Sequence, residues 1–365
     1  MDFEEPLMEF GHFCLPTYFP DVDGDVGLFM RRWLDLLTES EALGFDYLWV
    51  NEHHFDTYGG LIPSPPTMLA ALSQRTTRAR LGTSIVVLPL HNPIEIAEQL
   101  AMVDLMSGGR VEFGIGRGFV EFDYDRLGVS RDDAQMRMYE QLEVILKSWS
   151  GEPFTHEGQF YTYPKLEVWP RPEQRPYPPI WLSCTRTPAS FEWAGRMGYS
   201  ILTIPYIGVE PLAAMSGIYR DAWAEAGHPT DKRRIGAHFH CVLSESKKEA
   251  RKIGREAWRR YLLATTHTRD RERMDRDGPA EPSQRPGDQA PPDINRMVEE
   301  LRTVACTPDE AVTLLERAQD TLGFTHCDCT FFFGGVTYDQ AQRSLRLFAN
   351  EVIPRLKNRK PSITA

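Results

Sequence analysis

The sequence predicts a single (β/α)8 barrel, the TIM-barrel class of α/β fold. Strand-length apolar runs alternate with amphipathic helical stretches along the 365 residues, and eight such pairs can be recognised. Continuous apolar strands separated by helices indicate a parallel sheet covered by helices, and eight units favour a closed barrel over an open, doubly wound sheet. A doubly wound dinucleotide-binding sheet would carry the motif Gly-x-Gly-x-x-Gly after a strand. Gly114-Ile115-Gly116 begins such a motif, but its third glycine position is Phe119, and there is no Walker A sequence.

The eight pairs follow one another from the N-terminus to the C-terminus. The apolar runs are strand-length and rich in β-branched residues, whereas the helical stretches carry apolar residues three or four positions apart. Each expected strand is followed by its helix in this order: 10–15 and 27–43, 46–52 and 67–74, 79–88 and 94–106, 111–116 and 134–150, 180–183 and 189–197, 200–204 and 211–226, 235–243 and 247–263, and 326–333 and 338–353.

We expect residues 1–365 to form one domain, in which insertions at 117–130 and 151–178 interrupt the alternation of strands and helices. The second insertion is rich in aromatic residues and proline, which indicates a hairpin followed by an extended connection. Segment 268–295 is rich in Arg, Asp, Pro and Gly and nearly free of apolar residues. Such a segment cannot bury enough surface to offset its ordering entropy, so we expect a disordered, mobile loop. A lid over an active site and a plain surface linker are both open interpretations.

Charge and cysteine content exclude several classes of function. The 41 basic and 52 acidic residues give a net charge of −11 without a basic block, which argues against a nucleic-acid partner. No apolar run approaches the roughly 20 residues that span a bilayer, and the acidic N-terminus does not resemble a signal peptide, so we expect a cytoplasmic protein. The six cysteines lack zinc-ligand spacing and are expected to be buried, reduced thiols.

The residues that do chemistry in such a barrel follow the carboxyl ends of its strands, and Glu52-His53-His54 follows the second strand. A metal site is not expected here, because adjacent histidines on an extended chain point in opposite directions and no His follows at i+4 on a helix. One imidazole facing the barrel mouth could act as a general acid or base, tuned by a neighbouring carboxylate. The alternative is a hydrogen-bonded histidine with a structural role.

Two candidate anion-binding elements follow neighbouring strands. Arg117 lies between Gly116 and Gly118, which permit close approach of a ligand to the backbone, and a guanidinium binds phosphate through two hydrogen bonds. Thr185-Arg186-Thr187-Pro188 opens the helix after the fifth strand, where hydroxyls and free N–H groups can bind an anion. Each element alone could be a helix cap or a surface charge, but the pair predicts a phosphorylated cofactor.

These residues, in this order, make the sequence similar to the luciferase-like flavin-dependent monooxygenases, and most to the alpha (catalytic) subunit of bacterial luciferase. The resemblance extends over roughly residues 8 to 357. The matching stretches are Gly44-Phe45-Asp46-Tyr47-Leu48-Trp49 with Glu52-His53-His54-Phe55, Gly82-Thr83 through Val87-Leu88-Pro89, Gly109-Arg110 through Phe113-Gly114 with Arg117-Gly118, Glu192-Trp193, Cys306-Thr307-Pro308, and Leu347-Phe348 to Val352-Ile353-Pro354.

The resemblance implies roles for individual residues. His53 matches the family's catalytic histidine, and Glu52 and His54 are grouped with it as candidate catalytic residues. The implied cofactor-binding residues are Ser84, Ile85, Arg117, Phe119, Arg186, Thr187 and Ser190. Of these, Ser84-Ile85 matches a non-proline cis peptide beneath the flavin ring, and Phe119 a backbone N–H to the phosphate. Arg186 replaces a glutamate of luciferase, and Gly116 replaces its reactive cysteine, which we expect to leave more room beside the flavin.

The resemblance also implies the reaction. A separate flavin reductase would supply reduced FMN, O2 would add at C4a to give a peroxyflavin, and an organic substrate would be oxygenated by hydroxylation or Baeyer–Villiger insertion. Two alternatives stay open: F420-dependent hydride transfer, and a non-catalytic flavin-binding accessory subunit. A homodimer, or a heterodimer with a paralogous barrel, is implied as well. We expect an aromatic substrate pocket lined by Phe10, Phe55, Tyr58 and Phe119.

Overall fold

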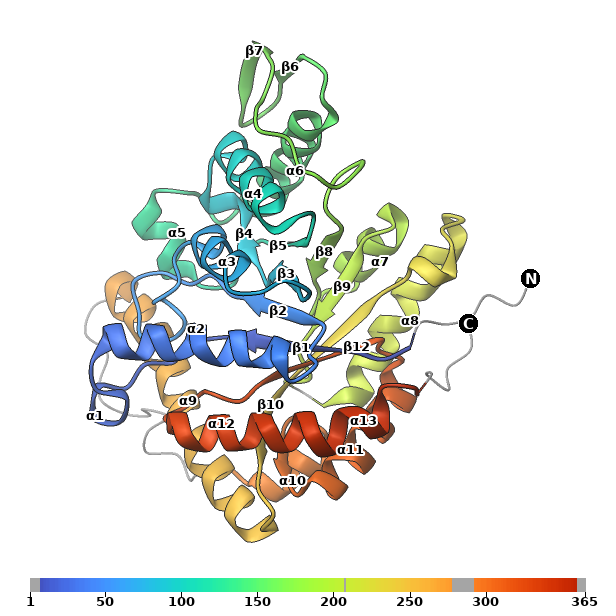
Figure 1. Cartoon of the computed structure of the whole chain (residues 1–365). Helices are drawn as coiled ribbons and strands as arrows, with labels where there is room; N and C mark the ends of the chain where they lie inside the picture. The colour runs from blue at the N-terminus through green and yellow to red at the C-terminus, as the bar shows by residue number, and fades with distance from the viewer. Residues whose placement is uncertain (1–6, 207, 278–291, 360–365) are drawn as a thin grey trace.

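Eight parallel strands close into a barrel, as the sequence predicts (Figure 1). The computed structural model describes residues 7–206, 208–277 and 292–359. In order around the barrel the strands are β1 (Glu9–Cys14), β2 (Tyr47–Val50), β3 (Arg80–Thr83), β5 (Val111–Gly116), β8 (Ile180–Ser183), β9 (Ser200–Thr203), β10 (Ile235–Leu243) and β12 (His326–Thr330). Pairing of β12 with β1 closes the ring, with Phe10 opposite Cys327.

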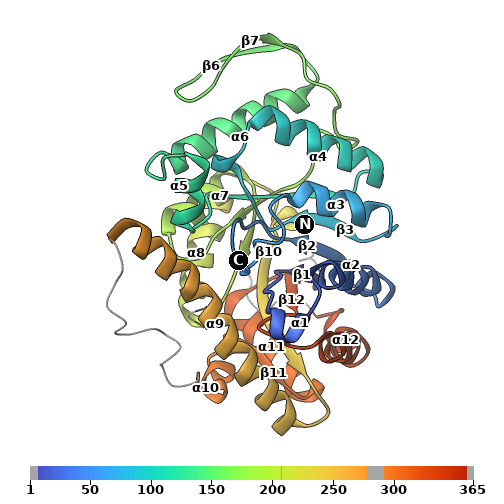
Figure 2. The same ribbon diagram turned by 90° about the vertical axis from the view of Figure 1, so that its left-hand side faces the viewer.

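Helices surround the barrel and connect its strands (Figures 1 and 2). The eight connecting helices are α2 (Val26–Ala42), α3 (Pro65–Ser73), α4 (Pro93–Ser107), α6 (Ala134–Ser150), α7 (Pro188–Met197), α8 (Val209–Glu225), α9 (Lys247–Asp277) and α12 (Tyr338–Leu347). The last continues through a π-helical turn (Phe348–Val352) into α13 (Ile353–Leu356). None of the helices in the described ranges is both long and apolar enough to cross a membrane.

The third predicted strand is interrupted. Instead of one strand over 79–88, the chain forms β3, a short β4 (Val86–Val87) and a 3-10 turn, η1 (Leu88–Leu90). The register against β5 shifts by one residue between the pairs Gly82–Glu112 and Val86–Ile115. Sequence periodicity misses this break because residues 79–88 form one run of strand length.

The insertions and the polar segment carry more structure than expected. Insertion 117–130 contains α5 (Glu121–Leu127), and insertion 151–178 forms the predicted hairpin, β6 (Phe154–Glu157) with β7 (Thr162–Leu166), which projects beside α6 (Figure 1). The expectation of a loop from residue 268 onward is wrong for 268–277, which continue α9. Residues 278–291 lie outside the described residues, and α10 (Ile294–Glu299) begins before the expected end of the loop.

One strand–helix pair between α10 and β12 was not expected. β11 (Val304–Cys306) pairs with β10 outside the ring of eight, and α11 (Pro308–Leu322) follows it. The N-cap Thr307 and Pro308 mark the start of this helix in the sequence, so a signal was present.

Large aromatic side chains fill the barrel interior away from the carboxyl ends of the strands. Trp49 stacks on Tyr47 at 5.6 Å and meets Trp181 edge-on at 5.2 Å. Glycine opposite Trp49 is required, because a Cβ on Gly82 would lie 2.0 Å from the indole Cε3. The indole Nε1 donates to the buried Asp328 at 2.8 Å. The core is therefore closed here, and a ligand must be bound at the other end, where the strands terminate.

Candidate active site

The carboxyl ends of the parallel strands bring the predicted site residues to one end of the barrel. Glu52, His53 and His54 follow β2, the Ser84–Ile85 peptide lies between β3 and β4, and Arg117 follows β5. The next strand around the ring is β8, and the pairing of Ile115 with Leu182 sets the chain after β8 beside the chain after β5. The topology thus assembles segments that are more than a hundred residues apart in the sequence.

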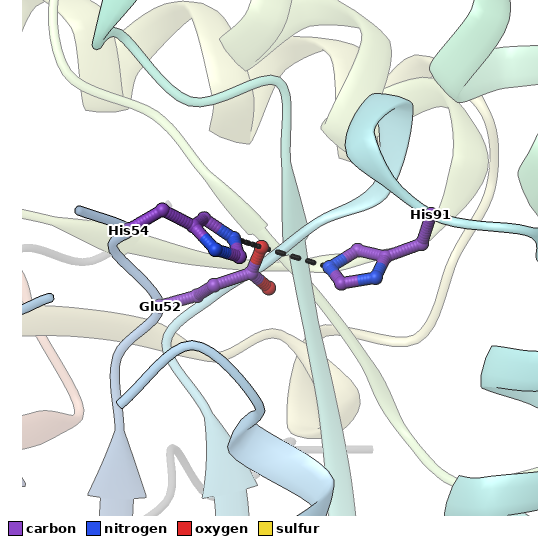
Figure 3. A group of neighbouring side chains, drawn as sticks. All are labelled: Glu52, His54 and His91. Atoms are coloured by element: carbon purple, nitrogen blue, oxygen red, sulfur yellow. Dashed lines mark hydrogen bonds and ion pairs between the residues drawn. The ribbon is translucent and has the colours of Figure 1, made fainter. Parts of the chain in front are cut away.

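Glu52 is the centre of a buried hydrogen-bond cluster (Figure 3). Its Oε1 lies 3.0 Å from Nε2 of His54 and 2.8 Å from Nε2 of His91, and its Oε2 accepts the backbone N–H of Val87 at 3.1 Å. Glu52 and His54 meet because side chains two positions apart on an extended chain lie on the same side. His91 is the residue after η1, and it was not among the predicted site residues. Only folding of the chain brings it to Glu52.

Glu52 and His54 stabilise each other's charged forms. Burial alone would raise the pKa of Glu52, but hydrogen bonds from His54 and His91 hold that pKa below its usual value. Burial would likewise lower the pKa of His54, and the contact with Glu52 outweighs burial and raises it. Glu52 is therefore the carboxylate partner of His54 and His91.

The ring of His53 packs against aromatic side chains outside this cluster. It lies 4.9 Å from the ring of Tyr58 and 5.6 Å from that of Phe119. Burial lowers the pKa of His53 to about 4, so the imidazole is neutral at neutral pH. Desolvation has the largest effect on the pKa of His53, and the charge of Glu52 opposes it. The same carboxylate bonds to His54 and raises the pKa of that imidazole.

A chain of tyrosine hydroxyls links the surroundings of His53 to α9. The hydroxyl of Tyr58, whose ring packs against His53, lies 2.9 Å from the hydroxyl of Tyr261, and Tyr261 lies 3.1 Å from the hydroxyl of Tyr206. Tyr261 is buried on α9. This contact could not be predicted from the sequence, because the three tyrosines belong to segments that are distant from one another in the chain.

The two predicted anion-binding elements end up on neighbouring strands. Arg117 is exposed, and within the described ranges its guanidinium makes no ion pair, while its carbonyl oxygen accepts a hydrogen bond from Tyr124. Thr187 is the N-cap of α7, and its side chain makes no capping hydrogen bond. Arg186 is exposed and Ser190 half-buried in the first turn. The exposed guanidinium of Arg117 and the start of α7 follow neighbouring strands. A guanidinium with hydroxyl and N–H donors at a helix start suits a phosphate, although the Ser190 N–H already donates to the Thr187 carbonyl at 2.9 Å.

The Ser84–Ile85 peptide bond is cis. It occupies the register break between β3 and β4, where the Thr83 hydroxyl donates to the carbonyl of Gly114 at 2.7 Å and accepts from the Gly114 N–H at 2.9 Å. The expectation of extra room at Gly116 is wrong. A Cβ at that position would lie 2.3 Å from Cδ1 of Ile85, so the Ile85 side chain already fills the space.

Several buried polar atoms at the strand ends have no hydrogen-bond partner among the described residues. They include both side-chain polar atoms of Asn51, which follows β2, and Oγ1 of Thr330, the last residue of β12. Buried polar groups are normally satisfied, so unpaired ones at a barrel mouth are donors and acceptors for a polar ring system. Together with the phosphate-type donors after β5 and β8, they fit a flavin mononucleotide, which has both a polar heterocycle and a phosphate.

Two of the four residues expected to line a substrate pocket contact His53, and a third contacts His54. Tyr58 and Phe119 contact the ring of His53, and Phe55 lies 5.7 Å from the ring of His54 and is half exposed, as is Phe119. The fourth, Phe10, was misplaced. It packs against Phe348 at 6.0 Å, in the layer between the barrel and its helices. Neighbouring strand residues alternate sides, and the sequence alone left the side of Phe10 undecided.

Comparison with known proteins identifies the family. The model of the luciferase-like monooxygenase family matches residues 8–326, so the chain belongs to that family. It is 29% identical over 363 residues to limonene 1,2-monooxygenase of Rhodococcus erythropolis, covering 95% of this chain and 86% of that protein. It is 31% identical over 226 residues to the oxygenase component of flavin-dependent trigonelline monooxygenase of Acinetobacter baylyi, covering 61% of this chain. The chain spans 62% of the length of the latter protein.

Solved structures share the whole architecture. The monooxygenase RslO1 from Streptomyces bottropensis superposes with a TM-score of 0.85 at 30% identity, covering 95% of this chain and 99% of that one. Two structures share the fold alone. One is the oxygenating constituent of 3,6-diketocamphane monooxygenase from Pseudomonas putida in complex with FMN (TM-score 0.75, 22% identity, 97% and 100% covered). The other is an F420-dependent secondary alcohol dehydrogenase (TM-score 0.73, 19% identity, 96% and 99% covered).

Proposed function

We propose that this protein is the oxygenase of a two-component, FMN-dependent monooxygenase that uses reduced FMN and O2 to oxygenate a small organic substrate. One observation carries the cofactor assignment: Arg117, without an ion-pair partner in the described ranges, follows β5, and the uncapped start of α7 follows the neighbouring strand β8. The relatives supply the reaction class, since two of them are named as monooxygenases and one of these as an oxygenase component.

Each predicted residue has a task in this proposal. Arg117, Arg186, Thr187 and Ser190 bind the phosphate, together with the backbone N–H of Phe119. Ser84 and Ile85 lie beneath the flavin ring. When bound, the reduced flavin supplies the reaction with O2, and the protein excludes water from it. His53, kept neutral by burial, accepts or holds a proton at its imidazole nitrogen. Glu52 and His54 support the peptide that carries His53.

The partners follow from the same argument. A separate flavin reductase supplies reduced FMN, as the name of the trigonelline relative implies for its own system. A second barrel, identical or paralogous, completes a dimer, and the cytoplasm is the compartment in which we place the pair. The two relatives act on chemically different molecules, trigonelline and limonene, so the substrate class proposed here is no narrower than a small organic compound.

Anaerobic titration separates this proposal from its alternatives. Quenching of the protein's tryptophan fluorescence by reduced FMN, reduced F420 and reduced riboflavin gives three affinities. The proposal expects reduced FMN to bind most tightly and riboflavin to bind more weakly by the contribution of the phosphate. Tighter binding of F420 would favour hydride transfer instead. Tight binding of FMN with no reaction toward O2 and no oxygenated product would favour an accessory flavin-binding subunit.

A further inference from the structure

The Glu52 cluster contains the donor set of a metal site. Oε1 of Glu52 and Nε2 of both His54 and His91 lie within 4.8 Å of one another, and the two imidazoles point at the same carboxylate oxygen (Figure 3). In a tetrahedral site with bonds of about 2.0–2.1 Å, donor atoms lie roughly 3.3 Å apart. The Glu52–His54 and Glu52–His91 distances of 3.0 and 2.8 Å need little change, and only the two imidazoles must adjust.

The surroundings of the cluster also suit an ion. The carboxylate of Glu52 is completely buried, so a cation would compensate a charge that has no access to water. Its other oxygen is already held by the N–H of Val87, which would keep the carboxylate oriented as outer partners do in metal sites. The side chains of His54 and His91 are 12% and 22% exposed, which gives an ion a route from solvent.

We propose that Glu52, His54 and His91 bind a divalent transition-metal ion, with Zn²⁺ preferred. Two imidazoles and one carboxylate form a donor set that such ions favour and that Mg²⁺ and Ca²⁺ do not. The ion takes the place of the two Nε2 protons, and each neutral imidazole then carries its proton on Nδ1. Three protein donors leave one position for water. The site joins the loop after β2 to the residue after η1.

Cobalt provides a direct probe. Chelator-treated protein titrated with Co²⁺ should develop the visible absorption of a low-coordinate cobalt site and reach one ion per chain by elemental analysis. His54→Asn and His91→Asn should each weaken binding at least about tenfold, since each removes a ligand. His156→Asn is the matched control. It breaks another histidine–glutamate contact, His156 with Glu140 at 3.1 Å, and should leave cobalt binding unchanged.

A second readout uses stability. Zn²⁺ should raise the unfolding temperature of the native protein and of His156→Asn, because ligand binding to the folded state stabilises it, but not that of His91→Asn. Circular dichroism of the variants without metal checks that they fold. Failure of Co²⁺ to bind, or equal binding by His54→Asn, His91→Asn and the native protein, would overturn the site and show only adventitious binding.

Discussion

At the residue scale, the site depends on the opposite environments of two adjacent histidines. His54 shares a carboxylate with His91, and its pKa is raised. His53 is half-buried against Tyr58 and Phe119, and desolvation lowers its pKa to about 4. One position along the chain thus separates a charged cluster from a neutral imidazole at the barrel mouth.

Replacement of Arg117 tests the phosphate assignment. Arg117→Ala removes a charge-assisted contact, worth on the order of 1.5–3 kcal/mol, so affinity for FMN should fall by about one to two decades. Donors around Thr187 remain, and binding should weaken without vanishing. Arg131→Ala, at another exposed arginine that pairs with Glu121, should leave the affinity unchanged.

Riboflavin is the control ligand for this variant, because it lacks the phosphate. Its affinity should barely change in Arg117→Ala, as measured by fluorescence titration. Equal losses for FMN and riboflavin would mean that Arg117 is not the phosphate ligand.

Replacement of His53 tests its role at the reacting centre. His53→Asn should retain flavin affinity but change the rate at which bound reduced flavin reacts with O2 by at least about tenfold, within the range of proton-transfer effects. His228→Asn, at a histidine bonded to the Arg196 carbonyl on the outer side of α7, should have no effect. A rate in His53→Asn equal to that of the native protein would remove His53 from the mechanism.

The pH dependence of the same rate follows from the lowered pKa of His53. The folded protein keeps this imidazole neutral at all pH values above about 4. The rate in the native protein should therefore stay constant through neutral and mildly acidic pH and fall only as the pH approaches that value. In stopped-flow measurements, a fall near pH 6.5, the ordinary value for histidine, would contradict the desolvated, neutral imidazole.

At the element scale, the boundaries between segments carry the features that sequence periodicity misses. The alternation of apolar strands and amphipathic helices is a local signal, and it predicted all eight strands of the ring. The break at Ser84–Ile85 depends on pairing with β5, which is not local. The extension of α9 to Asp277 was missed because low apolar content was taken as loop, although Arg and Glu are good helix formers.

Tyr261 should hold α9 against the barrel mouth. Tyr261→Phe removes both hydroxyl contacts, to Tyr58 and Tyr206, and should lower the free energy of unfolding by about 1–3 kcal/mol. Hydrogen exchange around residues 255–265 should become faster. Tyr219→Phe is the matched control. This substitution removes the hydrogen bond that the buried hydroxyl of Tyr219, on α8, donates to the Tyr199 carbonyl. It should lower the free energy of unfolding without accelerating exchange in α9. Unchanged exchange in Tyr261→Phe would show that the contact does not hold the helix.

At the scale of the whole molecule, the candidate site is a property of the closed barrel. The motifs after β2, β5 and β8 could be predicted from the sequence because each is a short, contiguous pattern. Asn51 and His91 also stand where apolar runs end, but the contact of His91 with Glu52 could not be predicted, because it arises only when separate strands end side by side. The misplacement of Phe10 has the same origin, since the side that a strand residue faces is decided by closure of the sheet.

The proposed dimer has a candidate surface on α4. Met102, Leu105 and Met106 are 50%, 45% and 43% exposed on this helix, and residues three and four positions apart share a face. The double variant Met102→Glu/Met106→Glu should therefore sediment as a monomer at concentrations where the native protein is a dimer. Met197→Glu, at an exposed methionine on α7, should remain dimeric. A native protein that is monomeric at micromolar concentration would refute the dimer.

The reaction of the protein with reduced FMN and O2 tests the central claim most directly. Protein mixed anaerobically with reduced FMN is mixed rapidly with air-saturated buffer, and the absorbance spectrum is followed over time. If the protein is a monooxygenase, a long-lived absorbance spectrum distinct from those of reduced and oxidised FMN should appear first. The spectrum of oxidised FMN should then return slowly, because the site excludes water. Re-oxidation as fast as that of free reduced FMN, together with anaerobic hydride transfer involving F420, would contradict a monooxygenase.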